Sequence, residues 1–307
     1  MPGARVLRRA APRAFAGAAA LTLGSGRFVI LGDLQPTSPL ERWRESNPQE
    51  RRRVVREIAR EEPDFVAALG DMVFCGSLDS QWRELEDVCE PLLQSRVPVF
   101  PILGNHEYWV LGRRSLARFD ARFPHLEGRR YYARRYGPLE LLFLDSNRRA
   151  LGLQEWSRQA AWLRERLAAA DADASVRGVL LFVHHPPFTN SVVVGDSRHV
   201  QHDIVPAFAA ARKTLAIFSG HVHSYERFAR GGKSYVVTGG GGAPRQRLST
   251  GARRRHADDL FAGGAVRSFH YLLATLSKSS LTIEMRALEK GAESFVSAES
   301  FALSLPA

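Results

Sequence analysis

Five short apolar runs along the chain each end in a small polar block. An apolar run of four to seven residues that stops at turn residues is typical of a buried strand. The runs are Phe28–Leu31, Phe65–Leu69, Val97–Leu103, Val179–Val183 and Leu215–Phe218. The blocks that follow them are Gly32-Asp33-Leu34-Gln35, Gly70-Asp71, Gly104-Asn105-His106-Glu107, His184-His185-Pro186-Pro187 and Gly220-His221-Val222-His223. Open α/β sheets bind ligands at the carboxyl ends of their strands, so these side chains are expected to converge at one sheet edge.

Helical patterns separate the first three runs. Asn47-Pro48 predicts a helix N-cap followed by proline in the first turn, and the helix is expected to end near Glu62. A further helix is predicted from Ser80, with Leu92 on its apolar face. Strand, helix and strand in alternation predict a mainly parallel sheet covered by helices, which is an α/β fold.

The second half of the chain is richer in strands. Tyr131–Tyr136 and Leu139–Leu144 flank Gly137-Pro138 and predict a hairpin at the start of a second sheet. A helix is expected over about Gln154–Ala170. Further strands are predicted at Ser234–Thr238, Phe269–Leu276, Leu281–Ala287 and Ser294–Phe301.

Two segments of this half are predicted to be loops. No helix follows the glycine run Gly239–Gly242, so a tight, close-packed turn is favoured over a phosphate-binding loop. The Arg-rich segment Arg245–Ala265 is expected to form a mobile loop.

Composition sets few limits on function. The chain has 307 residues, is 45% apolar, and has a formal net charge of +11 with 43 basic and 32 acidic residues. Because the arginines are scattered, the pattern does not favour a nucleic-acid partner. Solvated surfaces explain most of the charge, and a positive rim that attracts anionic phosphate compounds stays open as an alternative.

The cysteines and the N-terminus leave alternatives open. Cys75 and Cys89 have no metal-type spacing, and a single disulfide between them is possible. Residues 1–26 are assigned to an N-terminal segment, either a weak signal peptide around Ala14–Leu23 or disordered, and 27–307 to one domain. No run approaches the roughly 20 apolar residues of a membrane span. Both a cytoplasmic and a secreted location remain open.

The polar blocks together favour metal chemistry. Asp33 or Asp71 alone could simply cap a following helix. Two Asp at corresponding strand ends, joined by Asn105 and several histidines, instead predict a metal centre. If the segment after the fifth run is extended, His221 and His223 project from the same side of it. Oxygen and nitrogen ligands without thiolate suit two ions of Mn, Fe or Zn.

The order Asp, Gly-Asp, Gly-Asn-His-Glu, His and Gly-His-x-His from Phe28 to Tyr235 resembles the calcineurin-like metallophosphoesterase superfamily. The block Gly220–Arg227 is most similar to the purple acid phosphatase branch. The resemblance implies a four-layer α-β-β-α sandwich of two mixed sheets, with the metal site at the strand ends. It further implies these roles: Asp33 and His223 for the first metal, Asp71 as the bridge, Asn105, His184 and His221 for the second metal, and His106 as proton donor to the leaving group.

Two positions depart from the family pattern. The first block usually reads Asp-x-His, whereas here Gln35 takes the place of the histidine and is a weaker candidate ligand. Purple acid phosphatases supply a tyrosine three residues after the second Asp, and Phe74 stands there instead. A purple ferric centre is therefore not expected.

The predicted function is hydrolysis of phosphoester bonds by a metal-bridging hydroxide, with His106 assisting the leaving group. A phosphorylated small molecule is the expected substrate. A phosphodiesterase or nucleotidase on the same core is one alternative, decided by the loops Trp109–Tyr132, Thr189–His202 and Arg245–His256. A non-catalytic phosphate-binding module with a decayed first site is another. His199 and His202 are interpreted as surface-loop residues, with substrate binding left open as the alternative. His185 is interpreted as a supporting or substrate-facing residue.

Overall fold

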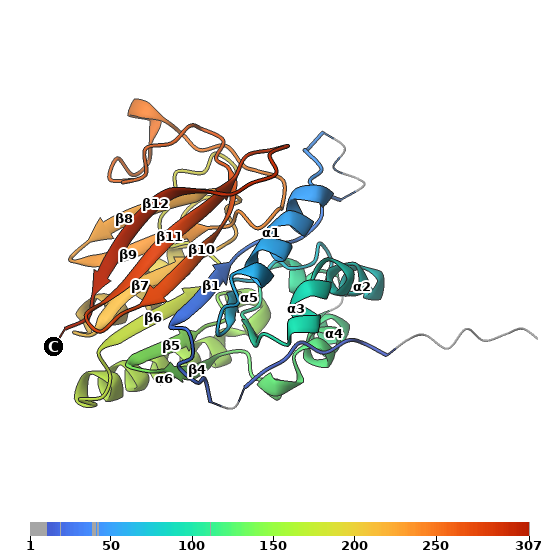
Figure 1. Cartoon of the computed structure of the whole chain (residues 1–307). Helices are drawn as coiled ribbons and strands as arrows, with labels where there is room; N and C mark the ends of the chain where they lie inside the picture. The colour runs from blue at the N-terminus through green and yellow to red at the C-terminus, as the bar shows by residue number, and fades with distance from the viewer. Residues whose placement is uncertain (1–10, 19, 39–40, 42, 111, 307) are drawn as a thin grey trace, which may run out of the picture.

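Two six-stranded mixed sheets form the centre of the computed structural model, which describes residues 11–306 except 19, 39, 40, 42 and 111 (Figure 1). The first sheet has the order β12-β11-β10-β1-β2-β3. Its strands are β1 Arg27–Leu31, β2 Val66–Ala68, β3 Val99–Pro101, β10 Phe269–Leu276, β11 Ser280–Leu288 and β12 Val296–Ser304. Strands β1, β2 and β3 are parallel, whereas β10, β11 and β12 continue the sheet with antiparallel pairing.

The second sheet has the order β4-β5-β6-β7-β9-β8. Its strands are β4 Tyr132–Tyr136, β5 Leu139–Phe143, β6 Gly178–Val183, β7 Thr214–Ser219, β8 Tyr225–Arg230 and β9 Lys233–Thr238. The four central strands are parallel, and β4 and β8 close the two edges with antiparallel pairs. The hairpin predicted around Gly137-Pro138 is confirmed by the pairing of Tyr136 with Leu139.

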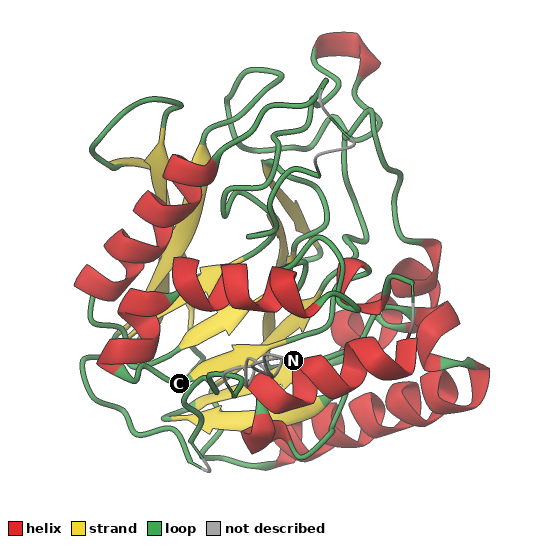
Figure 2. Ribbon diagram, turned by 90° about the vertical axis from the view of Figure 1, so that its right-hand side faces the viewer, coloured by secondary structure: helices red, strands yellow, loops and turns green. Residues whose placement is uncertain are grey.

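Successive side chains on a strand point to opposite faces of its sheet, and each sheet packs on both faces, which gives four layers. On β5, Leu141 and Phe143 belong to the apolar cluster shared with the first sheet, whereas Leu142 belongs to the cluster under the helix α6. Helices thus cover the outer faces of the two sheets (Figure 2). They are α1 Pro48–Arg60, α2 Asp79–Val88, α3 Glu90–Ser95 and α4 Gly112–Arg122 beside the first sheet, and α6 Leu153–Ala172, α7 Arg198–Asp203 and α8 Val205–Ala210 on the second. The predicted α-β-β-α fold is confirmed.

Shorter elements lie in the connections. They are the helix α5 Arg148–Leu151 and the 3₁₀ turns η1 His106–Tyr108, η2 Pro124–Leu126 and η3 Gly251–Arg253. Both α5 and η1 follow strands whose ends face the predicted site, so each belongs to the loops that surround it.

Three local predictions need correction. Asn47 precedes α1 as expected, but its side chain makes no cap and instead donates to the carbonyls of Gly242 and Ala243, each at 3.4 Å. The helix predicted from Ser80 through Leu92 is two helices that meet at Cys89. Cys75 and Cys89 are both free, so the disulfide that the sequence left open does not form.

The described part of the N-terminal segment packs against the fold. Phe15 is buried, its N–H donates to the Arg122 carbonyl at 2.8 Å, and Leu21 forms a bridge to Tyr136. Residues 1–10 lie outside the described part, and the boundary placed at residue 27 stays a prediction. None of the helices in the described ranges is long and apolar enough to cross a membrane.

The Arg-rich segment 245–265 has little regular structure, but the rest of the fold contacts it at several points. Isolated bridges join Leu248 to Ser191 and Asp259 to Phe228.

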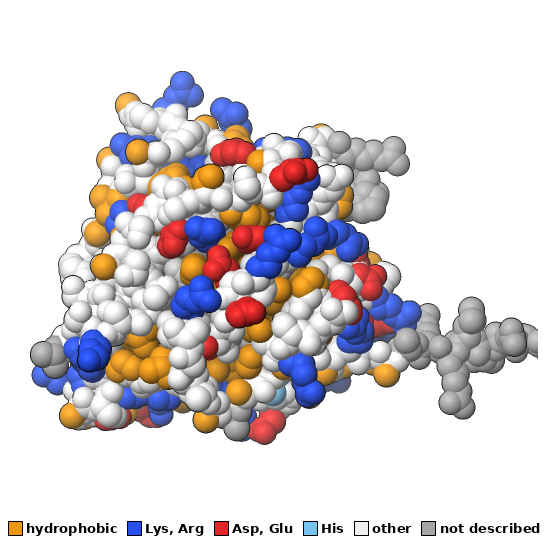
Figure 3. Space-filling view, in the orientation of Figure 1, with side chains coloured by type: hydrophobic (Ala, Val, Ile, Leu, Met, Phe, Trp, Pro, Cys, Tyr) orange, Lys and Arg blue, Asp and Glu red, His pale blue; other side chains and the backbone are white. Residues whose placement is uncertain are grey.

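On the face drawn in Figure 3, basic side chains are dispersed among acidic and apolar ones. This distribution agrees with the interpretation of most arginines as solvated surface residues.

Candidate metal centre

The strand-end blocks converge on the carboxylate of Asp71. Its Oδ2 lies 3.2 Å from His184 Nε2, and the same histidine nitrogen lies 3.1 Å from Asn105 Oδ1. Two groups of donor atoms, each within 4.8 Å of one another, share His184: one with Asp33 and Asp71, the other with His185 and His221. Residues from five separate strand ends therefore present oxygen and nitrogen donors to one small volume.

An uncommon backbone conformation positions three of these residues. Asp33, Asp71 and His221 have φ of 58°, 50° and 67°, in the left-handed region that non-glycine residues seldom adopt. Such conformations cost on the order of 1 kcal/mol each and concentrate at functional sites. Gly70 makes the turn before Asp71 possible, because its φ is 84° and a Cβ there would lie 2.4 Å from the Gly104 nitrogen.

The glycine run after β9 is close-packed, as predicted, and the structure places it against the centre. A Cβ on Gly239 would lie 2.2 Å from the Val222 carbonyl oxygen and 2.6 Å from Asp33 Oδ2. The run therefore allows a close approach of two backbone segments around the Asp33 carboxylate.

Backbone carbonyls fix the ring orientation of two histidines. The Nδ1–H of His184 donates to the Leu69 carbonyl at 2.8 Å, and that of His223 to the Pro244 carbonyl at 2.7 Å. Each ring therefore turns its Nε2 toward the centre, which is the usual support for a metal-binding imidazole.

The segment from Gly220 to Ser224 corrects one expectation about the histidine pair. It is not extended: the Val222 N–H donates to the Gly220 carbonyl at 2.8 Å, and the Ser224 N–H donates to the Val222 carbonyl at 2.7 Å. These tight turns send the two histidines to different neighbours. The His221 ring packs 5.0 Å from the His184 ring, whereas His223 Nε2 lies 3.7 Å from Asp33 Oδ1.

Gln35 lies where the resemblance requires a histidine. Its side-chain nitrogen is 3.1 Å from His223 Nε2, so the amide takes up the lone pair that a metal would use. Its Oε1 is buried with no hydrogen-bond partner. An unpartnered buried oxygen beside Asp33 and His223 fits a cation, because a cation would satisfy it. The residues present thus fit a metal in both halves of the centre, with an amide in the first.

The pKa values of the charged groups at the centre also suit cation binding. Burial raises the pKa of Asp33 well above its usual range. Burial acts in the same direction on Asp71, but the charges of His184 and His106 outweigh it and hold the Asp71 pKa below its usual range. Burial lowers the pKa of His184, and the charge of Asp71 reverses this and raises the pKa to about 9. A bound cation would replace the His184 proton and stabilise both carboxylates.

The imidazole of His106 is held beside the Asp71 carboxylate. Its Nδ1–H donates to the Phe74 carbonyl at 2.6 Å, and its Nε2 lies 3.8 Å from Asp71 Oδ2. The Trp109 ring packs on the imidazole with centroids 3.9 Å apart, and the Phe74 ring lies 5.1 Å from both. Phe74, the residue in place of a tyrosine ligand, therefore helps to position His106.

Glu107 has a structural task that the sequence pattern alone did not assign. Its buried carboxylate accepts the backbone N–H groups of Asp71, Met72 and Gly104, each at 2.8 Å. It therefore ties the second polar block to the third. Burial, followed by the charge of Asp71, raises the pKa of Glu107 to about 7.

His185 differs from His184 in its hydrogen bonds. The Ser146 hydroxyl oxygen accepts the backbone N–H groups of His184 and His185, at 3.2 and 2.9 Å. With both lone pairs used, its O–H donates to His185 Nδ1, 2.8 Å away. The His185 proton is therefore on Nε2, which makes this nitrogen a hydrogen-bond donor rather than a metal ligand. Burial lowers the pKa of His185 to about 3, in keeping with a neutral ring.

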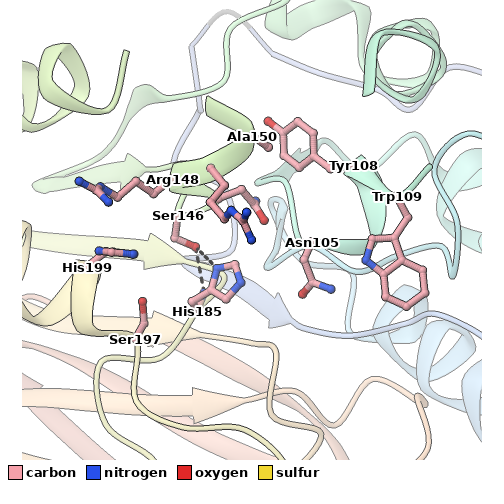
Figure 4. A pocket seen from close by; sticks show the side chains of 11 residues that line it. Asn105, Tyr108, Trp109, Ser146, Arg148, Ala150, His185, Ser197 and His199 are labelled. Atoms are coloured by element: carbon pink, nitrogen blue, oxygen red, sulfur yellow. Dashed lines mark hydrogen bonds between the residues drawn. The ribbon is translucent and has the colours of Figure 1, made fainter. Parts of the chain in front are cut away.

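A pocket of about 640 Å³ adjoins the centre. Figure 4 shows His185 and Asn105 between Trp109 on one side and His199 on the other. The residues that line the pocket are Asn105, Tyr108, Trp109, Ser146, Asn147, Arg148, Arg149, Ala150, His185, Ser197 and His199. His199 is exposed, as expected of a surface residue, and it also lines the pocket, whereas His202 is exposed and absent from the lining.

The segment 145–150 was missed as part of the site. Asp145-Ser146-Asn147 follows the apolar strand β5 in the same way as the five recognised blocks follow theirs. The same pattern of a polar block at a strand end would have identified it.

Comparison with known proteins agrees with this geometry. Residues 26–225 match the family model described as calcineurin-like phosphoesterase. Purple acid phosphatase 22 of Arabidopsis thaliana is 26% identical over 66% of this chain, which spans only 45% of that protein. A probable cyclic nucleotide phosphodiesterase of Rhodopseudomonas palustris is 29% identical over 64% of this chain and 71% of its own length.

The fold has a close counterpart among solved structures. The purple acid phosphatase from yellow lupin (Lupinus luteus) seeds superposes with a TM-score of 0.72 at 19% identity, over 91% of this chain and 53% of that one. The chain therefore belongs to the calcineurin-like phosphoesterase family.

Proposed function

We propose that the chain hydrolyses phosphoesters with two metal ions held by the strand-end residues. One observation carries the proposal: Asp71, Asn105 and His184 meet within 3.2 Å, with His106 beside them. Asn105, His184 and His221 would hold one ion, Asp33 and His223 the other, and Asp71 would bridge. Gln35 would contribute a weak oxygen ligand after its amide turns away from His223. Mn, Fe and Zn all suit this donor set.

When bound, the ions would neutralise the phosphoryl oxygens and lower the pKa of a water that attacks phosphorus. The residues of the chain supply the other steps. His185 donates its Nε2–H to a phosphoryl oxygen, because Ser146 fixes that proton in place. His106 gives its Nε2 proton to the departing alkoxide. The Phe74 carbonyl and the Trp109 ring keep this imidazole in position for the transfer.

Hydrolysis of phosphodiesters is the second candidate. The pocket beside Asn105 and His185 is within the size range of small-molecule sites, so it has room for a further ester substituent. The similarity to a probable cyclic nucleotide phosphodiesterase favours the same possibility.

A substrate panel tests the proposal. Metal-free protein is reconstituted with Mn²⁺, its metal content is measured, and turnover is followed on aryl phosphomonoesters, bis-aryl diesters, nucleotides and phosphopeptides. The proposal predicts metal-dependent turnover of at least one ester class. Bound metal without turnover of any of them would contradict hydrolysis and favour a phosphate-binding module.

A further inference from the structure

Arg148 lies in the pocket beside the metal centre, and none of the described side chains pairs with its positive charge. Its Nε is buried without a hydrogen-bond partner, and the described residues offer its guanidinium no carboxylate. Other buried arginines are paired: Arg51 with Glu84 at 2.6 Å, Arg122 with Glu86 at 2.9 Å and Arg267 with Asp259 at 2.8 Å. Nε also lacks a partner in the half-buried Arg118 and Arg134, but the first donates to the Arg114 carbonyl, and the second donates to the Ala133 carbonyl and lies over the Tyr132 ring. The described residues offer the Arg148 guanidinium no such contact, so it is available to a ligand at the pocket wall.

The surroundings of Arg148 favour an anion. None of the eleven lining residues is acidic, whereas Arg148, Arg149 and His199 supply potential positive charge. A cleft lined by one sign of charge concentrates ligands of the opposite sign.

The backbone that carries Arg148 is rigid. The neighbouring Asn147 side chain donates to the Leu103 carbonyl at 2.8 Å and to Asp145 Oδ1 at 2.9 Å. The Asp145 N–H in turn donates to the Gln159 side chain at 2.8 Å. Leu103 directly precedes Gly104-Asn105, so the start of α5 has a fixed place relative to the metal centre. Such preorganisation favours binding, because little freedom is lost when a ligand arrives.

We infer that this pocket binds a second anionic group of the substrate, carried on the leaving group, through the guanidinium of Arg148. The inference rests on the proposed hydrolysis at the adjoining centre. Asn105 and His185 border both regions, so a phosphoester held at the metals would place its leaving group in the pocket. The preferred substrates are therefore phosphoesters whose leaving group carries a carboxylate or a further phosphate.

Two esters of equal size test this inference. The kcat/KM of the Mn²⁺-reconstituted protein is measured on 4-carboxyphenyl phosphate and on its neutral counterpart 4-carbamoylphenyl phosphate. A charge-assisted pair predicts a preference for the carboxylate of about 10- to 100-fold. Arg148→Gln should bring the ratio of the two values close to one, whereas Arg164→Gln, an exposed position on α6 outside the pocket, should keep it.

Two outcomes would overturn the inference. If Arg148→Gln lowers turnover of both esters equally, Arg148 contacts the phosphate that is cleaved and not the leaving group. If the carboxylate preference is absent in the wild type, or survives in Arg148→Gln, the pocket does not select an anion.

A binding measurement separates this inference from the proposed function. Calorimetry compares 4-carboxybenzylphosphonate with 4-carbamoylbenzylphosphonate, neither of which can be hydrolysed. Tighter binding of the carboxylate, lost in Arg148→Gln, supports the anion site even if neither ester is turned over, in which case only the proposed hydrolysis fails. Equal binding of the two phosphonates overturns the anion site whatever the turnover.

Discussion

The two halves of the metal centre differ in what surrounds their histidines. In the half formed by Asn105, His184 and His221, the His184 Nε2 faces the oxygens of Asp71 and Asn105 at 3.2 and 3.1 Å. In the half formed by Asp33 and His223, the histidine Nε2 instead meets the Gln35 amide at 3.1 Å. In the first half a cation would take the place of a proton held between the histidine nitrogen and two oxygens, whereas in the second the amide must first leave the histidine nitrogen.

The difference shows that a change of one donor residue can alter a metal site while the hydrogen bonds that position its other residues are kept. His223 keeps its bond to the Pro244 carbonyl, and the His221 N–H donates to both Asp33 carboxylate oxygens, at 2.9 and 3.0 Å. The donor at position 35 is altered, and Phe74 offers no ligand to compensate for it. We therefore expect the two halves to hold metal with unequal affinity.

The largest effect is expected where the halves meet. Asp71→Asn removes the charge that both ions would share, so metal-dependent kcat/KM should fall by about 10⁴-fold or more. Asp87→Asn, an exposed position on α2, is the matched control and should leave activity unchanged. Activity retained in Asp71→Asn would mean that the halves do not share this carboxylate.

The next effect concerns the proton donor beside the intact half. His106→Ala should lower kcat by about 10² to 10⁴-fold on alkyl esters, whose leaving groups need a proton, and by less on p-nitrophenyl esters. Steady-state kinetics on both classes checks this. Equal losses on both would remove His106 from the role of acid.

A smaller effect is expected at Glu226, which links loops of the two halves. Glu226 lies on β8, three residues after His223. Its carboxylate accepts a hydrogen bond from the Thr189 hydroxyl at 2.5 Å and one from the Asn190 N–H at 2.7 Å. Burial raises the Glu226 pKa to about 7. Because the folded state then binds the proton more tightly than the unfolded state, this group makes stability fall as pH rises from about 4.5 to about 7.

Glu226→Gln should remove that part of the pH dependence, about 2 kcal/mol of unfolding free energy. Denaturant unfolding of the metal-free protein at pH 5 and pH 8 measures it, with the exposed Glu165→Gln as the control. The same slope in Glu226→Gln and wild type would show that Glu226 titrates normally.

The smallest effect is expected when a histidine is restored to the half formed by Asp33 and His223. Gln35→His replaces the amide by an imidazole and should tighten the weaker metal site by about 10-fold. Gln94→His, on the exposed side of α3, adds a histidine elsewhere and should not change it. Unchanged occupancy at limiting metal in Gln35→His would mean that Gln35 does not weaken the site.

Much of the fold follows from local pattern. The apolar runs and their turn residues located β1, β6 and β7 to within one or two residues, because buried parallel strands are continuous apolar segments. The convergence of the blocks followed from the same rule only within each sheet, since parallel strands end at one edge. That the edges of the two sheets meet at the centre did not follow from it. The break between α2 and α3 at Cys89 was missed, because apolar periodicity continues across it.

Side-chain environments were the part that sequence could not supply. That the Gln35 amide meets His223, and that Ser146 fixes the proton of His185, depends on contacts between residues 188 and 39 positions apart. The turns at His221 that separate the two histidines depend on a backbone conformation with φ of 67°, which no residue type there demands.

Calorimetric titration of the metal-free protein with Mn²⁺ tests the unequal halves most directly. Two binding events of different affinity are predicted, with His184→Gln removing the tighter one and His223→Gln removing the weaker one. Two events of equal affinity, or loss of the tighter event in His223→Gln, would contradict the account.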